Sequence, residues 1–172
     1  MRLIPKASFA LIPILGLLLF SAAPAFARNP GRYGYAAAFA GSYTLPDGSQ
    51  WLVGVALSGD TASSLSGFGL VCQVDPGTLV CKDPGPNGFQ ATGALTIDST
   101  TGTASLLWVV KDPGPGSLPG GTTSQCGGTV TSFGGGSSCG TGTQFTLTFP
   151  TGVSATGNTI FFAFRNPGPL GP

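Results

Sequence analysis

Apolar and polar residues alternate with a period of two along much of this chain. In residues 89–97 and 144–149, apolar or small residues occupy every second position, and mostly Thr and Gln lie between them. In residues 51–57 and 68–74, apolar residues again occupy every second position. Such alternation is typical of β-strands with one buried and one wet face. The pattern therefore predicts an all-β fold.

Two segments depart from this alternation because they are apolar at nearly every position. Residues 106–110 and 160–164 carry apolar side chains on both faces of the expected strand. Strands of this kind are usually covered on both sides, so we expect both to be buried on each face. Residues 34–41 are the one helical candidate after the first 27 residues, but they are short and bounded by glycine, which favours a strand.

Turn-forming residues between the apolar runs divide the chain into nine expected strands. These lie at 35–45, 50–57, 67–74, 78–82, 89–97, 103–110, 124–132, 143–149 and 159–165. Most connections are short, and consecutive strands joined by short connections usually pair with each other. We therefore expect an antiparallel meander that closes into a small up-and-down β-barrel, with a β-sandwich as the alternative.

Two hairpins can be placed from their turn residues. Leu-Pro-Asp-Gly-Ser at 45–49 suits a three-residue hairpin loop with Gly48 in the left-handed region. That register would set Tyr43 opposite Trp51 as an aromatic cross-strand pair. Residues 98–102 close the next clear hairpin.

A short cassette of an apolar strand, one cation, Asp or Asn, and Pro-Gly-Pro recurs along the chain. Its copies lie at 79–86, 106–115 and 161–169. Proline and glycine end each strand in a turn. The cations Lys82, Lys111 and Arg165 occupy the same place in each copy and would form a basic rim if the three turns share one end of the fold. The alternative is that each cation protects a strand end or pairs with a neighbouring Asp.

The first 27 residues have the features of a signal peptide. Arg2 and Lys6 precede an apolar run at 7–20, and Ala-Phe-Ala at 25–27 supplies a small-x-small cleavage pattern. A signal-anchor helix is the alternative. We expect removal of this segment and secretion to an extracellular or periplasmic location. Residues 28–172 would then form a single all-β domain with Gly/Pro-rich loops, large enough to bury a core.

The charge of residues 28–172 excludes one class of partner. Five basic residues face six acidic ones, which gives a net charge of −1. So few and scattered cations cannot form a basic surface that binds nucleic acid.

Four cysteines fit a secreted domain with structural disulfides. If residues 75–78 form a two-residue hairpin turn, Cys72 lies directly opposite Cys81 at a spacing that suits a disulfide. Elimination then pairs Cys126 with Cys139. The chain has no histidine, and the cysteine spacing does not match a zinc site, so we expect neither a metal nor a cofactor.

Catalytic chemistry has few residues available to it. The chain contains no His and no Glu, which excludes a Ser–His–Asp or Cys–His site within it. Gly-Ser-Ser-Cys-Gly at 136–140 matches the nucleophile-elbow pattern, but it lies in a glycine-rich segment without a base, so we interpret the match as chance. All six Asp adjoin turn residues, a position that Asp side chains favour: Asp47, Asp60, Asp75, Asp83, Asp98 and Asp112.

Aromatic residues are the remaining candidates for ligand contact. Trp51 with Tyr43 is a candidate stacking platform, and Trp108 with Phe162 is a candidate wall of an apolar pocket. The alternative is that all four residues simply belong to the core.

Together these features predict a secreted, non-catalytic β-domain that acts as a structural or interaction module of a surface, envelope or matrix. Its candidate partners are further copies of itself, a cell-surface polymer or a small apolar ligand. Alternatives are a β-barrel carrier of a small apolar ligand, an Asp-dependent carbohydrate-acting enzyme, and an outer-membrane barrel. The last is disfavoured by short strands with Thr and Gln on their wet faces, and no stable membrane span is expected after signal removal.

Overall fold

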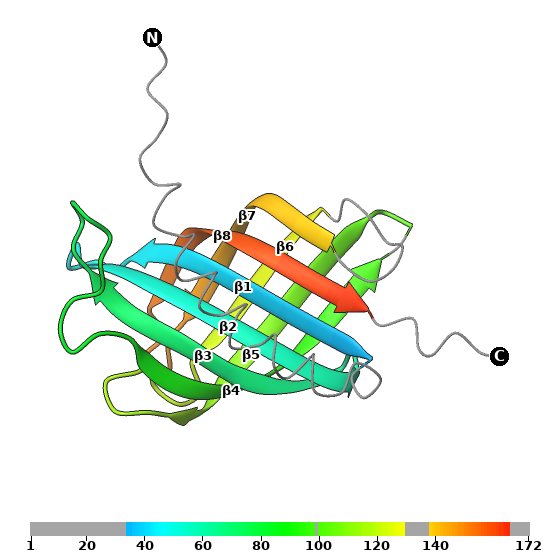
Figure 1. The fold of residues 1–172 in the computed structure, drawn as a ribbon, viewed down its shortest axis with the longest axis horizontal. Coiled ribbons are helices and arrows are strands. Elements are labelled where there is room, and N and C mark those ends of the chain that lie inside the picture. The colour runs from blue at the N-terminus through cyan, green and yellow to red at the C-terminus, as the bar shows by residue number, and fades with distance from the viewer. Residues whose placement is uncertain (1–33, 99, 130–137, 166–172) are drawn as a thin grey trace, which may run out of the picture.

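The computed structural model describes residues 34–98, 100–129 and 138–165, and these form eight antiparallel strands (Figure 1). The strands are β1 (Tyr35–Thr44), β2 (Gln50–Thr61), β3 (Ser64–Val74), β4 (Asn87–Asp98), β5 (Thr103–Pro113), β6 (Thr123–Thr129), β7 (Ser138–Thr148) and β8 (Ser154–Arg165). No helix occurs in these residues. The predicted signal peptide at 1–27 lies outside the described part of the chain.

The strands form a closed up-and-down barrel. Each strand pairs with its successor, and β1 pairs with β8 from Tyr35↔Arg165 to Tyr43↔Gly157 to complete the ring. The predicted all-β meander and barrel are therefore confirmed.

Two of the nine predicted strands need comment. The strand predicted at 78–82 is wrong, because these residues belong to the connection between β3 and β4 and make a single isolated bridge, Val74↔Cys81. The strand predicted at 124–132 is confirmed as far as Thr129, and residues 130–132 lie outside the described part.

Large apolar side chains fill the inside of the barrel. Those with almost no exposed surface include Phe39, Val53, Val55, Leu57, Leu65, Val71, Leu106, Trp108, Phe145, Leu147 and Phe161. The ring centroid of Phe39 lies 5.6 Å from that of Trp108 and 5.6 Å from that of Phe145. Small barrels with side chains in such contact have a packed core rather than a pore.

The outer face of β5 differs from the prediction. We expected both faces of residues 106–110 to be covered, but Leu107 points outward and is 55% exposed. Val109, the next outward residue, is half-buried, whereas the inward Leu106 and Trp108 are fully buried. In the other predicted doubly buried segment, 160–164, the side chains of Ile160, Phe162 and Phe164 lie outside the described residues.

The connections alternate between the two ends of the barrel (Figure 1). One end, here called the turn end, carries the β1–β2, β3–β4, β5–β6 and β7–β8 connections. The other, here called the terminal end, carries the β2–β3 and β4–β5 connections, the start of β1 and the end of β8.

Candidate functional site

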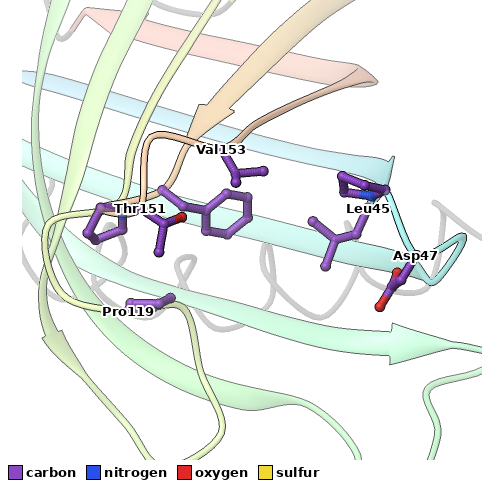
Figure 2. A pocket seen from close by; sticks show the side chains of 8 residues that line it. Leu45, Asp47, Pro119, Thr151 and Val153 are labelled. Atoms are coloured by element: carbon purple, nitrogen blue, oxygen red, sulfur yellow. The ribbon is translucent and has the colours of Figure 1, made fainter.

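Three connections at the turn end surround a groove of about 430 Å³, here called the end groove (Figure 2). Its lining residues are Leu45, Pro46, Asp47, Pro119, Phe149, Pro150, Thr151 and Val153. This volume falls within the roughly 300–1,000 Å³ of ordinary ligand pockets. The groove is a candidate site for an apolar ligand or peptide.

The β1–β2 hairpin forms one wall of the end groove and has the predicted geometry. The Leu45 NH donates to the Ser49 carbonyl at 3.0 Å, and Gly48 has a φ of 82°. The Ser49 hydroxyl and NH both donate to the Asp47 carboxylate, at 2.6 and 2.8 Å. These bonds hold the pKa of Asp47 below its ordinary value, with the hydroxyl bond contributing most. The carboxylate is therefore engaged within its own turn.

The β7–β8 hairpin forms the second wall in the same way. The Phe149 NH donates to the Val153 carbonyl at 2.9 Å, and Gly152 has a φ of 81°. This turn leaves the Val153 side chain 42% exposed beside Phe149. Pro119, from the β5–β6 connection, completes the groove.

A second candidate surface lies on the outside of β6, β7, β8 and β1. Cross-strand pairing aligns uncharged Thr, Ser, Asn and Gln residues there, and we call this surface the neutral polar wall. Its residues are Ser42, Thr123, Gln125, Gln144, Thr146, Thr148, Ser154, Thr156 and Asn158. All of them are exposed or half-buried.

The register arranges these residues in rows across the strands. Gln125 lies opposite Thr146, which in turn lies opposite Thr156. In the next row toward the turn end, Thr148 lies opposite Ser154, and their hydroxyl oxygens are 3.4 Å apart. Neighbouring strands are about 4.8 Å apart, and outward residues on one strand about 7 Å apart. The wall is thus a regular array of hydroxyl and amide groups.

Charged residues are placed at the barrel ends rather than on this wall. Among the described residues, each one lies in a connection or within the last three residues of a strand: Asp47, Asp60, Asp75, Lys82, Asp83, Asp98, Lys111, Asp112 and Arg165. Sequence alternation placed Gln144, Thr146 and Thr148 on one face of their strand, but the rows depend on the register, which the sequence did not supply.

A cleft of about 340 Å³ borders the neutral polar wall on the side of β2. Ser42, Thr44, Thr156 and Asn158 contribute polar groups to it, and Leu79 from the β3–β4 connection also lines it. The side chains of Leu79 and Cys81 pack on a small apolar cluster outside the barrel, formed by Leu52, Cys72 and Val74.

The predicted disulfide between Cys72 and Cys81 is confirmed, with a Cα–Cα distance of 5.6 Å. The predicted register is wrong, because Cys81 pairs with Val74 rather than with Cys72. A wider loop replaces the two-residue turn, and within it Leu79 has a φ of 56°. The disulfide therefore links diagonal positions rather than directly opposed ones.

The predicted disulfide between Cys126 and Cys139 is wrong. Cys126 carries a free thiol, faces the inside of the barrel and pairs with Phe145. Cys139 lies six residues from Phe145 along β7, which is about 20 Å and far beyond disulfide reach. The elimination argument failed because it assumed that every cysteine is paired. Burial raises the pKa of the Cys126 thiol to about 12. The side chain of Cys139 lies outside the described residues.

The predicted pairing of Tyr43 with Trp51 is confirmed, with stacked rings whose centroids are 6.5 Å apart. Tyr43 is buried and also contacts Phe145 edge-on. Burial raises the pKa of the Tyr43 hydroxyl well above its ordinary value. The pair therefore belongs largely to the core, and only part of Trp51 is open to solvent.

Trp108 also lies in the core, 1% exposed and stacked on Phe89 at 5.8 Å between ring centroids. Its cross-strand partner Ser124 is likewise buried. Neither the indole NH of Trp108 nor the hydroxyl of Ser124 has a hydrogen-bond partner among the described residues. The side chain of Phe162, the other candidate for this pocket, lies outside them.

The three cassette cations do not meet in one rim. Lys82 and Lys111 lie at the turn end, whereas Arg165 ends β8 at the terminal end. Lys111 lies near the end of β5 and Arg165 ends β8, and these two strands run in opposite directions because they are three strands apart in the antiparallel barrel.

Several Asp side chains have the turn role that we predicted. The Asp75 carboxylate accepts from the NH of Gly77 at 2.8 Å, and the Asp98 carboxylate accepts from the NH of Thr100 at 2.9 Å. The bonds within these turns lower the pKa of both carboxyls. The described residues contain no cluster of three or more His, Cys, Asp or Glu able to hold a metal ion.

Within the described ranges, no helix has the length and apolar character required to cross a membrane. Comparison of the chain with protein-family models, with curated proteins and with solved structures found no match.

Proposed function

We propose that this protein is an exported, non-catalytic interaction module of a cell surface, envelope or matrix, and that it binds a neutral, hydroxyl-rich polymer. The observation that carries this proposal is the register of β6, β7, β8 and β1, which aligns exposed hydroxyl and amide groups in rows with no charge among them.

The chemistry of the neutral polar wall suits a polysaccharide. Hydroxyl and amide side chains both donate and accept hydrogen bonds, as sugar hydroxyls do. Binding a neutral polymer there requires no buried charge, which would be costly to desolvate. The strands hold the side chains in a fixed array, which reduces the entropy lost on binding.

The adjoining cleft adds apolar contacts to this surface. Leu52, Val74 and Leu79 line it beside Thr156 and Asn158. Sugar rings have CH faces as well as hydroxyl edges, so a polymer lying across the wall would find partners for both.

Two further features support the remaining parts of the proposal. A disulfide is typical of an oxidising compartment such as the periplasm or the cell exterior. The chain lacks His and Glu, and the carboxylates of Asp47, Asp75 and Asp98 are hydrogen-bonded within their own turns.

A pull-down on insoluble neutral polysaccharides (cellulose, chitin and cross-linked dextran) tests this proposal. The wild-type protein should be retained by at least one of them. Thr156→Arg should weaken retention by about tenfold or more, because it places a charge and a long side chain at the centre of the wall. Thr96→Arg is the matched control, since Thr96 is an exposed Thr on the outside of β4, away from the wall.

Equal retention of Thr156→Arg and wild-type protein would contradict the proposal. So would a wild-type protein that stays entirely in solution with all three polymers. Circular dichroism of both variants would verify that the barrel is intact.

A further inference from the structure

We propose that the end groove binds residues 166–172 of a second copy of this chain, so that molecules associate head to tail. The groove lies at the turn end, and residues 166–172 follow β8, which ends at the terminal end. This inference goes beyond polymer binding and does not depend on it.

The surface that the end groove offers is apolar and exposed. Val153 is among the most exposed large hydrophobic residues that the structure describes, and Pro46, Pro119 and Pro150, which line the same groove, are also exposed. Asp47 is the one ionisable residue in the lining, and its carboxylate is engaged by Ser49. Exposed apolar hollows of this kind mark interaction sites.

The sequence Asn-Pro-Gly-Pro-Leu-Gly-Pro at 166–172 complements this groove. None of its side chains is charged, and Leu170 is its one large apolar side chain. Each proline fixes its own φ, so the segment loses less conformational entropy on docking. Proline-rich segments commonly bind in shallow grooves with an aromatic wall, and Phe149 supplies such a wall here.

The distance along the barrel excludes docking within one molecule. β8 has 12 residues, which corresponds to about 36 Å from the groove to Arg165. Residues 166–172 span at most about 25 Å when fully extended. The segment therefore cannot return to the groove of its own chain, whereas the groove of a neighbouring copy is available to it.

Such a contact joins two different surfaces, so each molecule keeps one free groove and one free segment. Heterologous contacts of this type form rings or open chains rather than closed two-fold dimers. A heptapeptide in a groove buries less than a standard interface of about 1,600 Å². We therefore expect weak association that grows with protein concentration.

Sedimentation velocity of the purified protein over a wide concentration range tests this inference. The weight-average mass of the wild-type protein should rise with concentration. Val153→Asp should block the groove and Leu170→Asp should block the segment, so each variant alone should remain monomeric. An equimolar mixture of the two should form a 1:1 dimer that does not grow further, because only one competent groove and one competent segment remain.

Leu107→Asp is the control for general surface stickiness, because Leu107 is 55% exposed on β5, outside the groove. This variant should associate as the wild-type protein does. A wild-type protein that stays monomeric throughout, or a mixture that contains only monomers, would overturn the inference. If these monomeric variants are retained on polysaccharide as well as the wild-type protein is, association through the groove and polymer binding by the wall are independent properties.

Discussion

Phe145 lies inside the barrel where two inward glycines leave room for its ring. A Cβ atom at Gly41 would lie 2.6 Å from Cε1 of Phe145, and one at Gly157 would lie 2.7 Å from the same atom. Glycine in a strand usually weakens it, but it also permits close approach of another group. At the residue scale, these glycines are therefore part of the core packing.

Gly41→Ala should destabilise the protein by about 1–3 kcal/mol, the usual cost of overpacking a core. Its methyl group would also meet the Asn158 carbonyl at 2.8 Å, so movement of Phe145 alone would not relieve the clash. Urea denaturation followed by tryptophan fluorescence would measure the loss. Gly88→Ala is the matched control, since its nearest neighbour would be 3.8 Å away, and it should change stability by less than about 0.5 kcal/mol.

The buried thiol of Cys126 should make stability fall at alkaline pH. Its pKa is raised from 9.0 to about 12 in the folded protein. Above pH 9 the unfolded chain therefore loses a proton that the folded protein retains. Stability from this group is present below pH 9 and is lost as pH rises toward 12, at up to about 1.4 kcal/mol per pH unit. Urea denaturation between pH 8 and 10 would measure this slope.

Cys126→Ala isolates this contribution, because the remaining slope then comes from other groups such as Tyr43, whose raised pKa acts in the same direction. Both proteins should carry Cys139→Ser so that a second thiol does not contribute. Identical slopes for the two proteins would contradict the assignment to Cys126.

At the scale of elements, the β3–β4 connection depends on its disulfide. This connection contributes Leu79 and Cys81 to the cluster with Leu52 and Val74. It pairs with β3 through one isolated bridge rather than a continuous ladder. The disulfide is thus the strongest link that holds the connection against the barrel wall.

Removal of this disulfide should cost about 2–3 kcal/mol of stability, from the chain entropy of the small loop that it closes. The double variant Cys72→Ser/Cys81→Ser should therefore unfold at a lower urea concentration than the wild-type protein under non-reducing conditions. Proteolysis should also cut within 75–86 more readily. An unchanged urea midpoint would show that the apolar cluster alone secures the connection.

The sequence predicted elements well where one local signal decides the structure. Apolar patterning and turn residues together located all eight strands, with ends that differ by at most five residues, and Gly48 specified the β1–β2 hairpin correctly. The turn at 75–78 failed because a Pro-Gly turn twists against the flanking strands. The chain instead widens to a loop closed by a bond of 3.0 Å from the Asp75 NH to the Val80 carbonyl.

At the scale of the whole molecule, the candidate surfaces combine residues that are remote in sequence. The end groove joins three connections, and the neutral polar wall joins β6, β7 and β8 with β1. Alternation shows which side chains share a face of a strand, but the rows depend on the pairing of β1 with β8. In β3 the alternating apolar residues, which the pattern predicted to be inside, lie on the outside: Cys72 and Val74 belong to the outer cluster, whereas Val71 lies in the core. Similarly, Arg165 lies away from Lys82 and Lys111 because β8 runs in the opposite direction to β3 and β5. These features follow from topology, which local patterns do not specify.

The pairing of Tyr35 with Arg165 has a consequence for how the protein is made. β1 finds one of its two partners only in β8, so the growing chain cannot close the barrel until β8 has left the ribosome. Pairings between such distant segments are slow to form. Closure of the barrel therefore comes late in folding, after all eight strands have been synthesised.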